Sequence, residues 1–205
     1  REGQARSVRE HLLAGLDFQD RLARFLENHD EPRAASTFAL GKHQAAALIT
    51  YLAPGLRFFH RGQLEGHTQR VSPHLGRAPD EPQNAVLRRF YDQLLSVLRQ
   101  PVVRDGHWQL VECRPAWEGN WTHDCFLVFA WQETGSNRLI VAVNFADHQS
   151  QCHARLPFAD LGGRPWRLQD QLSSACYDWN GDDLAARGLY LDMSPWQACV
   201  YVLVS

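Results

Sequence analysis

The stretch FLENHDEPR, residues 25–33, sets the fold expected for this chain. It completes a short apolar strand, expected over residues 21–27, and then changes abruptly to the polar cluster Asn28-His29-Asp30. Pro32 follows and stops further strand pairing. Adjacent His and Asp side chains at a strand end are typical of α/β enzymes, which build their sites where parallel strands end. The stretch therefore predicts an α/β fold with a functional site at this strand end.

Composition narrows the class of protein. The chain has 205 residues, 44% of them hydrophobic, and a formal net charge of −2, which predicts a globular protein with two structural parts. This charge gives no electrostatic basis for binding nucleic acid or an anionic membrane, and no apolar run approaches the ~20 residues that cross a bilayer. Five cysteines without a CxxC pair argue against zinc and leave at most one disulfide open. We expect mostly buried thiols and a cytoplasmic location.

Residues 1–100 are predicted to alternate helices and strands. Helical patterns cover residues 1–20, 37–52 and 84–99, and short apolar strands cover 21–27 and 56–59. This order contains two βα units. The polar, proline-rich stretch 67–82 is expected to form a long loop, and such loops in compact domains are often functional.

Residues 101–205 change to short apolar runs separated by turn residues, which predicts a second, all-β domain. This pattern favours an antiparallel β-sandwich. The predicted strands are Trp108–Cys113, Cys125–Trp131, Leu139–Phe145, Gln151–Leu156, Trp166–Leu168, Leu189–Met193 and Ala198–Val204.

FLENHDEPR also resembles the strand-seven motif of glycoside hydrolase family 13, the α-amylase family. The resemblance implies that residues 1–100 are the last two βα units, strands 7 and 8, of a (β/α)8 barrel, and that residues 101–205 are the C-terminal sandwich domain. It implies that Asp30 is the catalytic residue that stabilises the transition state and that His29 holds the same sugar.

Residues 55–64 resemble the family's eighth strand less closely. Gly55, Gly62 and Gln63 stand at matching positions. The departures, which suggest an atypical sugar subsite, are Arg57, His60, Arg61 and Leu64.

The expected substrate-binding residues are Asn28 and Glu27, beside His29, together with Gln63 and Glu65 after the second strand. Each has a simpler interpretation. Glu27 can instead pair with a nearby arginine. An exposed loop position is the default for Gln63 and Glu65. Asp30 can cap the next helix, although its context favours the site. For Arg33 we favour a structural salt bridge to Glu27 or Glu31. The loop histidines show no metal-ligand pattern.

Retaining glycoside hydrolysis needs two carboxyl groups ~5 Å apart, a nucleophile and an acid. The resemblance implies that both lie on strands upstream of Arg1, so we expect the chain alone to be inactive. The implied partner is an α-glucoside or α-glucan substrate, with no cofactor; calcium is possible in the parent protein but is not supported by this chain. An incomplete barrel would also leave an open strand edge, through which the fragment is expected to self-associate.

The alternative is a non-catalytic module that binds carbohydrate or has a structural role, or an inactive family member. Trp117 and Trp121 flank a predicted hairpin loop and suggest a surface glucan site. We favour the simpler interpretation, in which both close the loop over the sandwich core.

Overall fold

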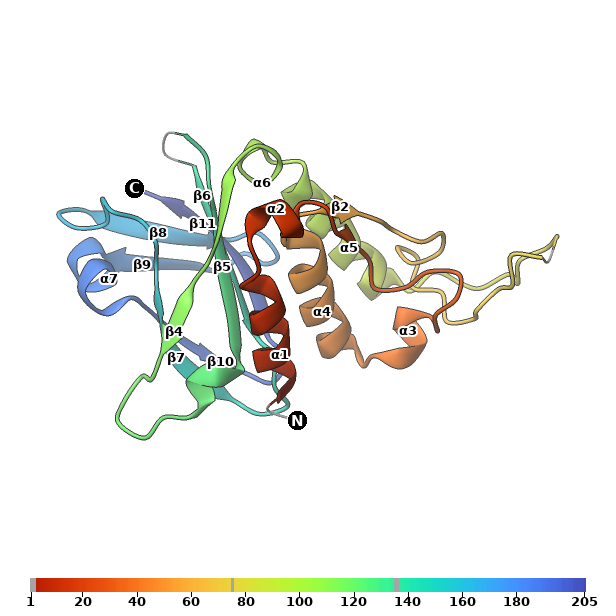
Figure 1. Ribbon diagram of the computed structural model, residues 1–205, viewed down its shortest axis with the longest axis horizontal. Helices are drawn as coiled ribbons and strands as arrows, with labels where there is room; N and C mark the ends of the chain where they lie inside the picture. Colours follow the sequence, from red (N-terminus) through yellow and green to blue (C-terminus); the bar gives the residue numbers. More distant parts are fainter. Residues whose placement is uncertain (1–2, 75, 135–136) are drawn as a thin grey trace.

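The computed structural model describes residues 3–74, 76–134 and 137–205 and has two parts that lie against each other (Figure 1). Helices and a small parallel sheet form one part, and two antiparallel sheets form the other. The elements of the first part are α1 (Gly3–Leu12), α2 (Leu16–Gln19), β1 (Ala23–Arg24), α3 (Ala34–Thr37), α4 (Leu40–Leu52), β2 (Leu56–Arg57), α5 (Ala85–Leu98) and α6 (Pro101–Arg104).

The strands β1 and β2 pair in parallel, with Ala23 opposite Leu56. Both are shorter than the predicted strands 21–27 and 56–59. The Phe58 amide still donates to the Arg24 carbonyl at 2.9 Å, but the apolar run after β1 leaves the ladder. The Leu26 amide donates to the hydroxyl of Tyr51, 3.3 Å away, rather than to a neighbouring strand.

The helices follow the predicted pattern with different boundaries. The helix predicted over 1–20 is divided at Gly15 into α1 and α2, and its first two residues lie outside the described part of the chain. The helix predicted over 37–52 begins at Leu40 because Phe38 and Ala39 have extended backbone conformations. Helix α5 matches its prediction, and the Asn84 side chain caps it by accepting from two backbone amides.

The strands of the second part form a β-sandwich. A six-stranded sheet has the order β3-β5-β6-β11-β8-β9, and a three-stranded sheet has the order β10-β7-β4. The strands are β3 (His107–Leu110), β4 (Glu112–Arg114), β5 (Phe126–Gln132), β6 (Arg138–Asn144), β7 (Ser150–Arg155), β8 (Pro165–Asp170), β9 (Cys176–Asn180), β10 (Leu189–Met193) and β11 (Ala198–Val204).

Two features of the sandwich differ from the prediction. The run Trp108–Cys113 forms two strands, β3 and β4, which belong to different sheets. Strand β9 and helix α7 (Gly181–Arg187) were not predicted. Their segment is mostly polar and exposed, so it lacks the apolar alternation on which a strand prediction rests.

Both faces of the six-stranded sheet are covered, which explains its continuous apolar strands. Leu127 and Phe129 of β5 face a core shared with α4 and α5, while Phe126 and Val128 face the core between the two sheets. The indole of Trp131 donates to the Leu52 carbonyl at 2.8 Å and fixes α4 to the sheet. The helical part and the sheet thus share one core, and the domain boundary at residue 100 stays a prediction.

The five cysteines are free thiols. Within the described part of the chain, no helix is both long enough and apolar enough to span a bilayer.

Candidate active site

The residues after β1 form a tight turn that Asn28 organises. The Oδ1 atom of Asn28 accepts hydrogen bonds from the backbone amides of Asp30, at 2.8 Å, and Glu31, at 3.0 Å. An Asn side chain that bonds backbone amides two and three residues on is a common way to build such a turn. The chain therefore changes direction at Asn28 and presents the next two side chains to solvent.

His29 and Asp30 are the exposed pair of this turn. The Nε2 atom of His29 lies 3.3 Å from Oδ2 of Asp30, and the two side chains are 59% and 73% exposed. Arg70, from the long loop after β2, donates from Nε to the His29 carbonyl at 3.3 Å. The predicted loop thus contacts the turn. An accessible carboxylate beside an imidazole can accept from and donate to the hydroxyl groups of a ligand.

Glu27 lies beneath the turn, in a buried cluster with Arg33 and His60. One carboxylate oxygen of Glu27 accepts from the Ala34 amide at 2.6 Å, and the other lies 2.9 Å from Nη2 of Arg33. His60 Nδ1 lies 3.6 Å from Glu27 and 3.0 Å from Arg33 Nη1. Arg33 also donates to the Arg61 carbonyl. The cluster therefore ties the end of β1 to the loop after β2.

Burial raises the pKa of Glu27, because the charged carboxylate loses water. The amide of Ala34 and the charge of Arg33 oppose this shift. The Glu27 side chain is 1% exposed, so it offers no surface for the predicted contact with a substrate. The structural salt bridge predicted for Arg33 is confirmed, with Glu27 as its partner.

Gln63 is also buried, and its side chain binds other protein groups. Its Nε2 atom donates to the hydroxyls of Tyr51, at 2.7 Å, and Tyr91, at 3.0 Å, while Oε1 accepts from the His60 amide. The side chain is 1% exposed. Gln63 was expected either on an exposed loop or in contact with a sugar, and this buried location matches neither expectation. Its side-chain amide instead joins the loop to Tyr51 of α4 and Tyr91 of α5.

A buried polar network extends from Gln63 and was missed by the sequence reasoning. His43 Nε2 lies 2.7 Å from the Tyr91 hydroxyl, and the Tyr51 hydroxyl donates to the Phe58 carbonyl. Burial lowers the pKa of His43 to about 4 and raises that of Tyr51 to about 12, so both are neutral at pH 7. A signal was present: His43 and Tyr51 interrupt an alanine-rich helix, and buried polar groups need partners.

Glu65 lies apart from this network. Its carboxylate pairs with Arg88 of α5 at 3.1 Å, and Arg88 also pairs with Asp92. The Glu65 side chain is about one-third exposed, so contact with a ligand stays a prediction. Within the described residues, no group of three His, Cys, Asp or Glu side chains is placed to hold a metal ion.

Trp117 and Trp121, expected to close a loop over the sandwich core, are each 54% exposed. Neither residue is therefore part of the sandwich core, although Trp121 meets His148 edge to face. The loop is instead held by Asn120, whose side chain accepts from the Ala116 amide and donates to Thr122.

Comparison with solved structures identifies the fold. The chain is similar to an α-amylase from Geobacillus thermoleovorans, solved with acarbose, with a TM-score of 0.69 and 18% identity over 98% of this chain and 42% of that one. It is similar to a maltogenic α-amylase from Thermotoga neapolitana, with a TM-score of 0.66 and 12% identity over 89% of this chain and 41% of that one. It is also similar to a trehalose-6-phosphate hydrolase from Bacillus licheniformis, with a TM-score of 0.60 and 13% identity over 98% of this chain and 46% of that one.

No protein-family model matches the sequence, and no curated protein matches it at a significant level. The chain spans less than half the length of the enzymes whose structures it matches, which is consistent with a C-terminal portion. At these identities the likeness shows the fold, a mixed α/β portion with antiparallel sheets that these glycoside hydrolases share with the chain.

Proposed function

We propose that the chain is the C-terminal portion of a retaining glycoside hydrolase or transglycosylase that acts on α-glucosidic bonds. In this proposal β1 and β2 are strands 7 and 8 of a (β/α)8 barrel, and residues 101–205 form the domain that follows it. Support comes from the parallel register of β1 and β2 and from helices α4 and α5, which follow them. In parallel barrels the site lies at the carboxyl ends of the strands, where the 28–30 turn begins.

The exposed carboxylate of Asp30 would stabilise the positive charge that develops on the sugar ring in the transition state. His29 would bind hydroxyls of the same sugar. Asn28 would keep both side chains in position through its hydrogen bonds to the turn. A fixed negative group stabilises the transition state without having to reorganise during the reaction.

One observation carries the proposal: an exposed pair stands on a buried support. Glu27 and Arg33 are nearly inaccessible and close the turn after β1, and Arg33 also contacts His60 and Arg61 after β2. Asp30 and His29 remain open to a ligand. Burying two charges costs on the order of several kcal/mol before they pair. A polar turn without a function would not need such an ion pair beneath it.

The two remaining carboxyl groups of a retaining mechanism would come from residues outside this chain, ~5 Å apart across the scissile bond. The isolated chain would then bind sugar weakly and turn over none. A cytoplasmic location fits the free thiols.

The experiment compares the full-length protein with its Asp30→Asn and Glu31→Gln variants on a panel of α-glucosides and α-glucans, followed by NMR. Asp30→Asn removes the charge at the proposed site, and we expect a loss of roughly 100-fold or more in kcat/KM. Glu31→Gln removes a neighbouring exposed charge and should stay within about twofold. Release of the α-anomer or transfer of glucosyl units would separate hydrolase from transglycosylase.

Full activity of Asp30→Asn, or a wild-type protein that turns over no α-glucoside, would overturn the proposal. In the second case the exposed aromatic residues of the sandwich favour the carbohydrate-binding alternative.

A further inference from the structure

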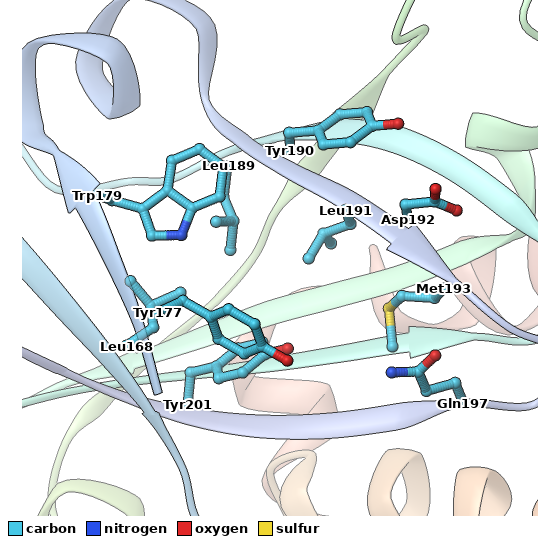
Figure 2. A pocket seen from close by; sticks show the side chains of 10 residues that line it. All are labelled: Leu168, Tyr177, Trp179, Leu189, Tyr190, Leu191, Asp192, Met193, Gln197 and Tyr201. Atoms are coloured by element: carbon cyan, nitrogen blue, oxygen red, sulfur yellow. The ribbon is translucent and has the colours of Figure 1, made fainter. Parts of the chain in front are cut away.

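The two sheets of the sandwich end beside each other at β9 and β10, and the seam between these strands is hollow. Strand β9 is the last of the six-stranded sheet and β10 the last of the three-stranded sheet. A cavity of about 190 Å³ lies between them, lined by side chains from both strands and from β8 and β11 (Figure 2). The seam is thus a concave surface at the edge of the fold, in the part of the chain that follows residue 101.

Aromatic rings form the walls of this hollow. Figure 2 shows Trp179 and Tyr190 on one side and Tyr177 and Tyr201 on the other. Tyr177 is 48% exposed and Tyr190 37% exposed. Tyr177 also meets Tyr201 edge to face, with ring centres 6.0 Å apart, which fixes its orientation.

The floor of the hollow is apolar and buried. Leu168, Leu191 and Met193 are each at least 95% buried and belong to the core between the sheets. Asp192 stands at the rim. Its Oδ1 atom accepts from the side-chain Nε2 atoms of Gln149, at 2.7 Å, and Gln151, at 3.0 Å. These bonds orient its carboxylate.

A second hollow of about 350 Å³ lies beside the first. Trp179 and Tyr190 line both, so the two rings stand between the hollows. The second hollow adds His153, Asp183 and Arg187. The combined surface therefore alternates aromatic faces with polar groups of both charge signs.

We propose that this seam binds an α-glucan chain, away from the 28–30 turn. A pyranose ring has an apolar face of C–H groups, which packs on an aromatic ring, and a rim of hydroxyls, which bonds to carboxylates, guanidinium groups and imidazoles. A surface with charges of both signs is suited to a neutral polyhydroxylated ligand, and two neighbouring hollows with shared aromatic walls suit a chain of sugars. The choice of α-linked glucose rests on the proposed function.

The competing occupant is a protein strand that adds to β9 or β10, since exposed sheet edges recruit other chains. That contact would use the backbone and would not need the faces of Tyr177 and Tyr190. Ring-specific variants therefore separate the two.

The test is amide hydrogen exchange of the full-length protein with and without maltoheptaose. We expect maltoheptaose to slow exchange in residues 176–180 and 189–193. In Tyr177→Ala/Tyr190→Ala, the maltoheptaose concentration that gives half of this protection should rise by at least about fivefold, because aromatic anchors dominate such interfaces. Tyr177→Phe/Tyr190→Phe keeps both rings and should stay within about twofold. Trp121→Ala, which removes an exposed aromatic residue elsewhere on the sandwich, should also stay within about twofold.

Exchange at residues 28–30 in the same experiment reports on the other site. Protection at the seam without turnover would leave this inference standing while the proposed function fails. Turnover or protection at 28–30 without protection at the seam would overturn the inference alone. Unchanged binding in Tyr177→Ala/Tyr190→Ala, or equal protection by cellohexaose, would also overturn it.

Discussion

Glu27 and Arg33 lie 2.9 Å apart with both side chains at least 96% buried, directly beneath the turn that exposes His29 and Asp30. The two charges come from opposite ends of that turn, since Glu27 precedes it and Arg33 follows it. Their pairing closes the turn, and the bond from Ala34 to Glu27 fixes the start of the next helix. The exposed pair therefore depends on the buried one for its position.

Arg33→Met should destabilise the protein strongly because it leaves the Glu27 carboxylate buried without its charge partner. We expect a loss of about 3–5 kcal/mol in the free energy of unfolding, measured by urea denaturation. Arg88→Met is the matched control, since Arg88 pairs with Glu65 and Asp92 near the surface. Its loss should be much smaller than that of Arg33→Met, because solvent screens exposed ion pairs. Equal losses in the two variants would contradict the role given to the buried pair.

Asn28→Ala should affect the position of the turn more than global stability. The variant loses two bonds to backbone amides in an exposed segment, worth about 1 kcal/mol together. Asn28→Asp keeps an acceptor oxygen at the same place and should recover most of the effect. In the full-length protein we expect kcat/KM on an α-glucoside to follow the same order, with Asn28→Ala lowest. Equal kinetics in Asn28→Ala and wild type would argue that the turn holds its shape without the side chain.

Much of the fold was predictable because its signals are local. Helix α5 was predicted from its apolar face, which its sequence pattern shows directly. The sandwich strands that carry long apolar runs were found for the same reason. Strand β9 was missed because Tyr177 and Trp179 point into a partly open seam and polar residues surround them.

The candidate site was predictable only where its residues are exposed and adjacent in sequence, as at His29-Asp30. The positions of Glu27 and Gln63 were not, because their burial depends on partners far along the chain. Gln63 bonds to Tyr91, 28 residues away, and no spacing rule brings these two together. A polar residue beside a strand end looks the same in sequence whether it contacts a ligand or supports the residue that does.

Stability should fall in mild acid because of His43. Burial lowers its pKa from 6.5 to about 4, so on lowering the pH the unfolded chain takes up this proton before the folded one does. The contribution of neutral His43 to the free energy of unfolding is intact above pH 6.5 and is lost as the pH falls toward 4. The loss reaches up to about 1.4 kcal/mol per pH unit and amounts to roughly 3 kcal/mol in all.

The measurement for His43 is urea denaturation at pH 7 and at pH 4.5. His43→Gln cannot titrate and keeps a polar group near Tyr91, so its stability should change less between the two pH values. His74→Gln removes an exposed loop histidine and should behave as wild type does. A pH dependence that is the same in all three proteins would assign the acid sensitivity to other groups.

The isolated 205-residue chain should self-associate through the face of its parallel sheet. Leu56 is 70% exposed on β2, and Phe25 and Phe58 are each more than 40% exposed, in edge-to-face contact with ring centres 6.3 Å apart. A two-stranded sheet has unpaired edges on both sides, and exposed edges next to apolar side chains recruit other chains.

Light scattering of the isolated chain should therefore give a mass above 23.4 kDa that rises with concentration. Leu56→Glu/Phe58→Glu places charge on the exposed face and should shift the chain toward monomer. Val86→Glu, at an exposed position of α5, should leave association unchanged. If the wild-type chain is a uniform monomer with strong amide protection at residues 21–27, then β1 and β2 are stable without neighbours. That result would count against the barrel proposal, because these strands would then need no further partners.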